Sequence, residues 1–63
     1  MTPKDFMEEW FYEWFDGKRL EAITAETACK WLHLWLDYEW DIPESLTVSE
    51  VVRIWNELVE VEQ

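Results

Sequence analysis

The 63-residue chain has little cysteine, glycine or proline, and it lacks any long run of apolar residues. Its single cysteine, Cys29, excludes an internal disulfide framework. No stretch approaches the roughly 18 uninterrupted apolar residues of a membrane span. The N-terminus, MTPKDFMEEW, is acidic and amphipathic, whereas a signal peptide has a basic start followed by an apolar run. These absences predict a soluble protein of a reducing compartment, and we expect a cytoplasmic location.

Basic residues are also scarce, because five Lys and Arg stand against fifteen Asp and Glu, which gives a net charge of -10. Direct binding to nucleic acid or to an anionic membrane requires a basic footprint, so neither is expected. Strong acidity accompanies disorder when the hydrophobic content is low. Here 49% of the residues are hydrophobic and six are Trp. The chain is therefore predicted to fold, and its partner is predicted to be a basic surface of another protein.

The length of the chain predicts one domain, residues 1–63. A domain this short buries only about 60% of the surface that its unfolded chain exposes. The pockets of roughly 300–1,000 Å³ that small-molecule sites use are hard to build at this size. No catalytic motif occurs, and although Cys29 and His33 stand four residues apart, a metal site normally needs three or four ligands. We therefore expect no enzymatic activity, no metal and no cofactor.

Three segments begin with residues that are typical of helix N-termini. Thr2 lies three residues before Asp5, which is the spacing of a reciprocal capping box. Thr24 is a second N-cap candidate. Thr47 and Glu50 form the S/T-x-x-E capping box directly before an apolar run. The chain therefore has three predicted helix starts.

Two residues indicate where the first two helices end. Gly17 tolerates the left-handed conformation that closes many helices, and Pro43 disfavours helical geometry at the residue before it. The sequence therefore predicts an all-α fold with helices over residues 3–16, 25–40 and 48–61. Helices of this length with short connections are typical of a small antiparallel three-helix bundle.

The first and third predicted helices each have one apolar side when they are projected at 100° per residue. These sides predict core residues in both helices: Met7, Trp10, Phe11 and Trp14, with Phe6 and Phe15 at the margins, and Val51, Ile54, Trp55, Leu58 and Val61. Acidic and polar residues, among them Asn56, occupy the opposite sides. Both patterns are those of ordinary amphipathic helices.

The helix predicted over residues 25–40 has more apolar residues than one buried stripe holds. One stripe consists of small and aliphatic residues, and we predict that it faces the other helices: Ala25, Ala28, Cys29, Leu32 and Leu36. A second stripe lies on another side, with Trp35 between the two: Trp31, Leu34 and Tyr38. Together they cover about 240° of the circumference, whereas the stripe of a surface helix covers roughly 100°.

Two interpretations of the second stripe are open. The chain itself can cover it, for example through Leu20 and Ile23 in the segment 17–24. Alternatively, the stripe is an exposed apolar patch that binds another protein, because Trp and Tyr dominate interface energetics. We favour this second interpretation, and it predicts an apolar anchor formed by Trp31, Leu34, Trp35 and Tyr38.

Carboxylates form two groups in the predicted partner-binding surface: a row along the first helix at Asp5, Glu9, Glu13 and Asp16, and a cluster at the end of the second at Glu39 and Asp41. Like charges four residues apart cost a few tenths of a kcal/mol each, so stability does not explain the row. The row either keeps a Trp-rich protein soluble or imitates the phosphates of a nucleic-acid strand. Each step along the row rises about 4.5–6 Å, which is comparable to, though not matched with, the axial rise of about 3.4 Å per phosphate.

In composition the chain resembles the small acidic inhibitors of bacteriophages and mobile elements, which include anti-restriction and anti-CRISPR proteins. The resemblance implies an inhibitor or adaptor that docks on a basic site of a host protein that handles nucleic acid. It also implies a location in the cytoplasm of the host cell. No residue role is carried over, because the resemblance lies in composition alone. The alternative is a homodimer that packs through the second apolar face of helix 25–40.

Overall fold

The computed structural model describes residues 2–15 and 21–62, apart from the side chains at positions 14, 15 and 62. Within these ranges it contains three helices and no strand: α1 (Pro3–Phe15), α2 (Ala25–Asp37) and α3 (Val48–Glu62). The predicted all-α fold with three helices is confirmed. The predicted last residue of the first helix, Asp16, and the stop at Gly17 lie outside the described residues.

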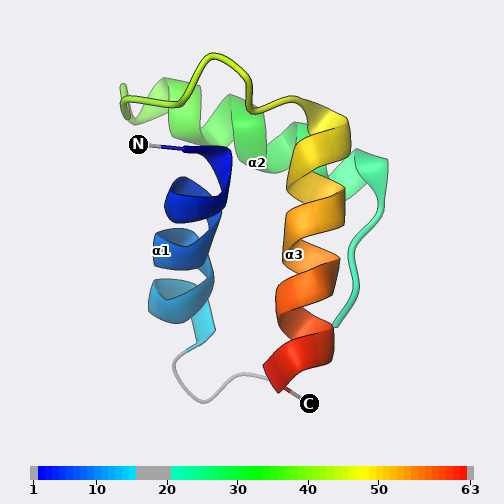
Figure 1. Ribbon diagram of the computed structural model, residues 1–63. Coiled ribbons are helices and arrows are strands. Elements are labelled where there is room, and N and C mark those ends of the chain that lie inside the picture. The colour runs from blue at the N-terminus through cyan, green and yellow to red at the C-terminus, as the bar shows by residue number, and fades with distance from the viewer. Residues whose placement is uncertain (1, 16–20, 63) are drawn as a thin grey trace.

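The helices α1 and α3 lie side by side and run in the same direction, and α2 crosses them at a steep angle (Figure 1). This crossing differs from the antiparallel alignment that the short connections predict. Both α1 and α2 approach α3, whereas no Cα atoms of α1 and α2 lie within 8 Å of each other in the described chain. Aromatic rings fill that space, with the centroid of Trp35 5.0 Å from that of Phe6 and 5.2 Å from that of Trp10.

The core consists of aromatic and aliphatic side chains from all three helices and from the connection before α3. Its buried members are Phe6, Met7, Trp10, Phe11, Ala28, Trp35, Leu46, Val51, Ile54, Trp55 and Val59. The core prediction for α1 is confirmed at Met7, Trp10 and Phe11, while the side chain of Trp14 lies outside the description. Aromatic pairs in this core meet edge to face, an arrangement that contributes roughly 0.5–1.5 kcal/mol per pair beyond the buried area.

The helix α3 buries a side that is centred on Trp55, which is 3% exposed. The prediction is confirmed at Val51 and Ile54 as well, but it is wrong at Val61, which is 78% exposed. Val59 is buried instead, at 5% exposed. At 100° per residue, Val59 lies much closer to Trp55 around the helix than Val61 does, so the centre of the buried arc explains both outcomes.

The helix α2 buries the side on which Trp35 lies, between the two stripes that the sequence predicts. Trp35 and Ala28 are 0% exposed, and Trp31 is half-buried against the core. The predicted small-residue seam is therefore wrong at three positions, which are all exposed: Ala25, Cys29 and Leu36. An indole at the centre of the buried face removes more apolar area from water than the small residues of the seam do. For the same reason Trp35 is not part of an exposed anchor.

The helix α2 ends at Asp37, earlier than the predicted end at Trp40. The backbone N–H of Glu39 donates to the carbonyl of Leu36 at 3.0 Å, and that of Trp40 donates to the carbonyl of Trp35 at 3.1 Å. This pair of bonds is a Schellman motif, in which the residue directly after the helix cap takes the left-handed conformation. Glu39 takes that conformation with φ 57°. The sequence carries no glycine there, so the pattern gives no sign of the turn.

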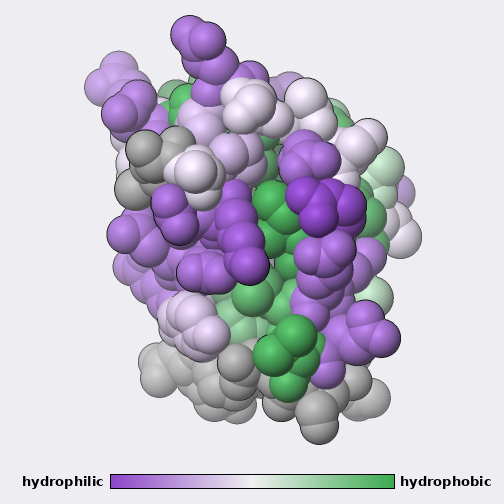
Figure 2. Space-filling view, in the orientation of Figure 1, coloured by the Kyte–Doolittle hydropathy of each residue, from purple (hydrophilic) through white to green (hydrophobic). Residues whose placement is uncertain are grey.

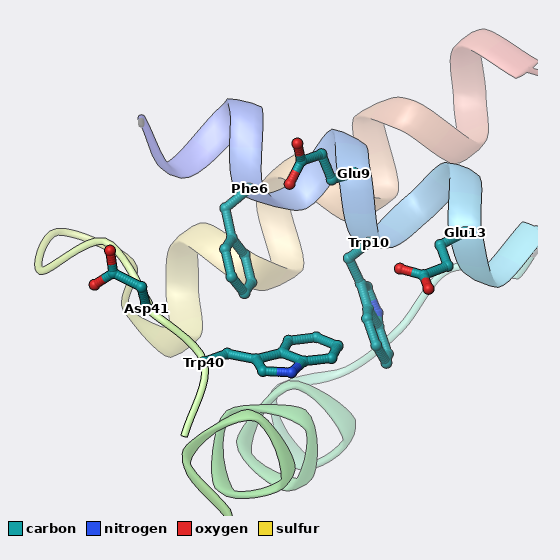
Figure 3. A pocket seen from close by; sticks show the side chains of 6 residues that line it. All are labelled: Phe6, Glu9, Trp10, Glu13, Trp40 and Asp41. Atoms are coloured by element: carbon teal, nitrogen blue, oxygen red, sulfur yellow. The ribbon is translucent and has the colours of Figure 1, made fainter. Parts of the chain in front are cut away.

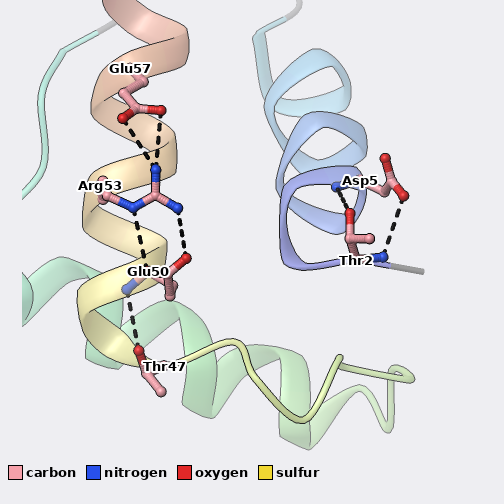
Figure 4. Close-up of polar contacts among 6 residues, drawn as sticks. All are labelled: Thr2, Asp5, Thr47, Glu50, Arg53 and Glu57. Atoms are coloured by element: carbon pink, nitrogen blue, oxygen red, sulfur yellow. Dashed lines mark hydrogen bonds and ion pairs between the residues drawn. The ribbon is translucent and has the colours of Figure 1, made fainter.

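Two of the predicted N-terminal caps make their side-chain hydrogen bonds (Figure 4). The backbone N–H of Asp5 donates to Thr2 Oγ1 at 3.1 Å, and the N–H of Thr2 donates to Asp5 Oδ2 at 3.3 Å, so this box is reciprocal. The N–H of Glu50 donates to Thr47 Oγ1 at 3.3 Å. The Glu50 carboxylate accepts from Arg53 Nη2 at 2.7 Å, and this hydrogen bond lowers the pKa of Glu50.

The segment 21–24 is held to α3 by hydrogen bonds between side chains and backbone. Asn56 Oδ1 accepts from the N–H of Ile23 at 2.8 Å, and its Nδ2 donates to the carbonyl of the same residue at 3.3 Å. The indole N–H of Trp55 donates to the carbonyl of Glu21 at 2.8 Å. These bonds fix the entry to α2, where Thr24 occupies the N-cap position without a side-chain cap bond.

The left-handed turn predicts that Glu39→Gly raises stability. A non-glycine residue in this conformation costs of the order of 1–3 kcal/mol, and glycine removes the steric part of that cost but adds entropy to the unfolded chain. We expect a net gain of about 1 kcal/mol, measured as a higher urea midpoint at an unchanged slope. The control is Glu39→Gln, which removes the charge and keeps the steric cost. An equal gain in both variants would assign the effect to charge instead of backbone conformation.

We call the two hydrogen bonds between the Asn56 side chain and the backbone of Ile23 the Asn56 clamp. We expect Asn56→Ala to destabilise the protein by about 1–3 kcal/mol, because the partly buried N–H and carbonyl of Ile23 lose their partner. Urea unfolding measures the loss, and hydrogen exchange at the Ile23 amide measures its location. The exposed residue Glu60 on the same helix supplies the control Glu60→Ala, with an expected change within about 0.5 kcal/mol. Unchanged protection of the Ile23 amide in the Asn56 variant would contradict the clamp.

Candidate functional site

A cleft of about 290 Å³ opens between α1 and the turn that follows α2. Six residues line it, three of them aromatic and three acidic: Phe6, Trp10 and Trp40, and Glu9, Glu13 and Asp41. In Figure 3 the rings of Phe6 and Trp10 extend from α1 toward the ring of Trp40, and the three carboxylates lie around this group. We refer to this site as the aromatic–acidic cleft.

Helical spacing places four of the lining residues. Phe6 and Trp10 are four residues apart and lie on the side of α1 that faces the core, so their side chains leave the helix one turn apart in the same direction. Glu9 and Glu13 have the same spacing on the adjacent side, which separates them by about 6 Å along the helix axis. The left-handed turn at Glu39 directs the chain back from the end of α2 and brings the next residues to this surface.

The rings of Phe6 and Trp10 each contact the ring of Trp40. The centroid of Trp40 lies 6.4 Å from that of Phe6 and 5.6 Å from that of Trp10, with interplanar angles of 66° and 67°. Phe6 and Trp10 are 8% and 7% exposed, so most of each ring belongs to the core, while Trp40 is 39% exposed. Tyr38 stacks against the ring of Trp40 with a centroid distance of 5.4 Å. The cleft therefore joins buried aromatic support to one accessible indole.

The charge of the cleft is entirely negative among the described residues. Glu9, Glu13 and Asp41 are exposed, and no basic side chain lines the cleft. The described ion pairs lie elsewhere: Lys30 approaches Glu26 at 3.8 Å, and Arg53 pairs with glutamates of α3. Carboxylates beside aromatic rings form a site for a cation, because both the carboxylate charge and the ring quadrupole attract positive charge.

The acidic surface continues along α1 beyond the cleft. An adjacent hollow is lined by Asp5, Glu8, Glu9 and Tyr12, and it shares Glu9 with the cleft. The described residues that line this hollow include no basic side chain either. Figure 2 shows hydrophilic side chains over the outer sides of α1 and α3, with hydrophobic atoms between the two helices. The side of α1 that carries Asp5, Glu8, Glu9 and Glu13 is therefore an acidic surface, with the exposed Lys4 in the first turn of the helix and the aromatic–acidic cleft at one border.

The structure brings some of the predicted site residues together and separates others. Glu9, Glu13 and Asp41 line the cleft, Asp5 lines the adjacent hollow, and Asp16 lies outside the described residues. Glu39 is exposed in the left-handed turn. Among the members of the predicted apolar anchor, Tyr38 is 57% exposed. The others are buried or half-buried against the core: Trp31, Leu34 and Trp35.

The interpretation of Trp31, Leu34, Trp35 and Tyr38 as one exposed stripe is therefore wrong, because only Tyr38 is exposed. The rings beside the carboxylates are those of Phe6, Trp10 and Trp40, which sequence reasoning did not assign to a site. The signal in the sequence is the pair of i, i+4 rows in α1, one aromatic and one acidic. The contribution of Trp40 depends on the turn at Glu39, and no local pattern predicts that turn.

In the described part of the chain, no group of three or more His, Cys, Asp and Glu side chains is placed to hold a metal ion. None of the described helices combines the length and the apolar character that a membrane span requires. Comparisons with known protein families, with curated proteins and with solved structures give no match. Functional inference therefore rests on the geometry and chemistry of the residues themselves.

The position of Trp31 predicts that Trp31→Ala is mainly a stability change. Its ring centroid lies 4.7 Å from that of Trp55 and 5.8 Å from that of Trp10, so truncation removes contacts with both other helices. We expect a loss of about 2–4 kcal/mol, toward the low end for buried aromatic residues because Trp31 is only half-buried. The exposed Tyr38 supplies the control Tyr38→Ala, with an expected loss below about 1 kcal/mol. Equal losses in urea unfolding would contradict the packing role.

Proposed function

We propose that this protein is a small non-enzymatic module that docks on a basic surface of another protein, and that the partner handles nucleic acid. The observation that carries the proposal is the aromatic–acidic cleft at the border of the acidic surface of α1, whose described lining residues include carboxylates and no basic side chain. The net charge of -10 gives the whole molecule the same sign.

Charge and apolar surface have different parts in this docking. A strongly acidic surface steers a basic partner during encounter and raises the association rate, with an effect that falls as salt is added. Exposed aromatic residues supply the apolar contact that charges alone do not provide, and Trp and Tyr are the residues enriched in binding hot spots. In this protein the exposed Trp40 and Tyr12 lie beside the carboxylates of the cleft and of the adjacent hollow, and the exposed Tyr38 contacts Trp40, so these rings supply the apolar contact.

The spacing of the α1 carboxylates supports a partner that handles nucleic acid. Asp5, Glu9 and Glu13 recur every four residues, which corresponds to about 6 Å along the helix. Phosphates along one nucleic-acid strand rise about 3.4 Å each, so the carboxylate repeat is of the same order, though not matched with it. An acidic helix in a basic groove that binds such a strand competes with nucleic acid, and the protein then acts as an inhibitor or adaptor. The acidic, phage-inhibitor-like composition is consistent with this role.

The alternative of a homodimer through α2 has less support. Trp31 and Leu34 pack against the protein's own core, so the second apolar face of α2 has little left to offer a symmetry mate. Leu36 and Tyr38 remain exposed, at 61% and 57%. A net charge of -10 on each copy opposes self-association. Sedimentation as a monomer at high concentration would remove this alternative.

The proposed function predicts charge-dependent capture of nucleic-acid-binding proteins. The full chain is immobilised, a bacterial lysate is applied at moderate salt, and bound proteins are identified by mass spectrometry after elution with duplex DNA. We expect the DNA eluate to be enriched in nucleic-acid-binding proteins. We expect the double variant Glu9→Gln/Glu13→Gln to lose most of that eluate. These positions are chosen because Asp5 also accepts a hydrogen bond from Thr2 at the start of α1.

The matched control is Glu26→Gln/Glu60→Gln, which removes two exposed carboxylates outside the cleft and the hollow. It changes the net charge by the same amount, so it separates the acidic surface of α1 from overall acidity. We expect this control to retain capture. Equal loss of capture in both double variants, or proteins that DNA does not elute, would contradict docking through α1 on a nucleic-acid-binding surface.

A further inference from the structure

The aromatic–acidic cleft is bounded by two different elements of the chain. Phe6, Glu9, Trp10 and Glu13 come from α1, whereas Trp40 and Asp41 follow the left-handed turn after α2. In Figure 3 the carboxylates of Glu9 and Glu13 lie along α1 and that of Asp41 lies beyond Trp40, so acidic groups from both elements border the three rings. A cation in the cleft therefore lies beside aromatic rings and is bordered by carboxylates of two elements.

From this arrangement we infer that the cleft binds the guanidinium group of an arginine side chain presented by the basic partner. The inference rests on the proposed function, because it identifies the side chain through which that partner is anchored. The occupant is cationic because the described residues of the lining are carboxylates and aromatic rings, with no basic group among them. A volume of about 290 Å³ lies at the lower limit for small-molecule pockets, and it suits one side chain.

Arginine fits this lining better than lysine does. The guanidinium is planar, stacks on aromatic rings and is more weakly hydrated than an ammonium group. Its five N–H donors point outward in one plane, so one guanidinium can stack on Trp40 and donate to carboxylates from both elements. An ammonium group is a compact, strongly hydrated charge without a flat face. The combination of an accessible indole and carboxylates of two elements therefore selects guanidinium.

Contacts with neighbouring rings fix the positions of the cleft's aromatic side chains before a ligand binds. Phe6 and Trp10 are held in the core by edge-to-face contacts with Trp35, at centroid distances of 5.0 and 5.2 Å. Trp40 is held from one side by both of these rings and from another by Tyr38. Few aromatic side chains therefore need to be ordered when the arginine enters, which reduces the entropic cost of binding.

The test is a titration of the ¹⁵N-labelled full chain with the peptide acetyl-Gly-Arg-Gly-amide at about 150 mM salt, where long-range electrostatic attraction is screened. The readout is the side-chain indole N–H signals in NMR spectra. We expect saturable shifts, with the largest at Trp40 and smaller ones at Trp10. The same peptide with citrulline, which has nearly the same shape without the charge, is expected to bind at least tenfold more weakly. A lysine peptide is expected to bind several-fold more weakly.

Variants separate the cleft from the overall charge. Glu9→Gln/Glu13→Gln is expected to weaken the arginine peptide at least tenfold, whereas Glu26→Gln/Glu60→Gln should stay within about twofold of the unsubstituted chain. Trp40→Leu is expected to abolish the shift at Trp10, and Trp40→Phe to retain part of the affinity because a ring remains. Since Trp40 also packs on α1, the dispersion of the other indole signals checks that each variant is folded.

Two results would overturn the inference: equal binding of the citrulline or lysine peptide, or equal weakening by both pairs of glutamate substitutions. These results leave the proposed function separately testable. A chain that captures DNA-displaceable proteins but shows no arginine-specific shift at Trp40 keeps the proposed function and contradicts the arginine cleft. A chain with the arginine-specific shift but no DNA-displaceable capture keeps the cleft and contradicts docking on a nucleic-acid-binding surface.

Discussion

Aromatic rings occupy the space in which α1 and α2 would otherwise meet, and the rest of the structure depends on this filling. Trp10 and Phe6 of α1 contact Trp35 of α2 edge to face, while Trp31 reaches Trp55 of α3. Because these rings are large, the backbones of α1 and α2 remain apart, and α2 lies across the pair formed by α1 and α3 (Figure 1). The burial is strong enough to hold the indole N–H of Trp35 in the core without a hydrogen-bond partner in the described chain.

The same separation of helices creates the candidate site. At the end of α2 the chain has to return across the face of α1 to reach α3, and the left-handed residue Glu39 makes that reversal. Trp40 then lies against the outer edges of Phe6 and Trp10. The cleft is thus the border of the aromatic core, where rings that are buried on one side are accessible on the other. Its carboxylates come from the sides of the same elements that face solvent.

Local features of the fold could be read from the sequence, and features that depend on tertiary contacts could not. The reciprocal box at Thr2 and the side-chain cap at Thr47 were predictable because each involves residues only three positions apart. The buried face of α2 was not, because both apolar stripes were similarly wide, and the burial of the side between them, centred on Trp35, depends on contacts with the rings of α1. The end of α2 was missed for a related reason. Glu39 carries no local preference for a left-handed turn, so its conformation follows from the packing of Trp40.

In the cleft the buried aromatic residues contribute to the stability of the fold, and the exposed carboxylates contribute to the proposed binding. Phe6 and Trp10 belong to the core, so their substitution changes the fold together with the cleft. The carboxylates of Glu9, Glu13 and Asp41 have no ion pair with the described basic residues, and repulsion among them makes a small unfavourable contribution to stability. By contrast, Arg53 compensates the acidic residues of α3. Uncompensated charge is therefore concentrated beside the one accessible indole of the cleft, where a cation supplied by a partner relieves the repulsion as it binds.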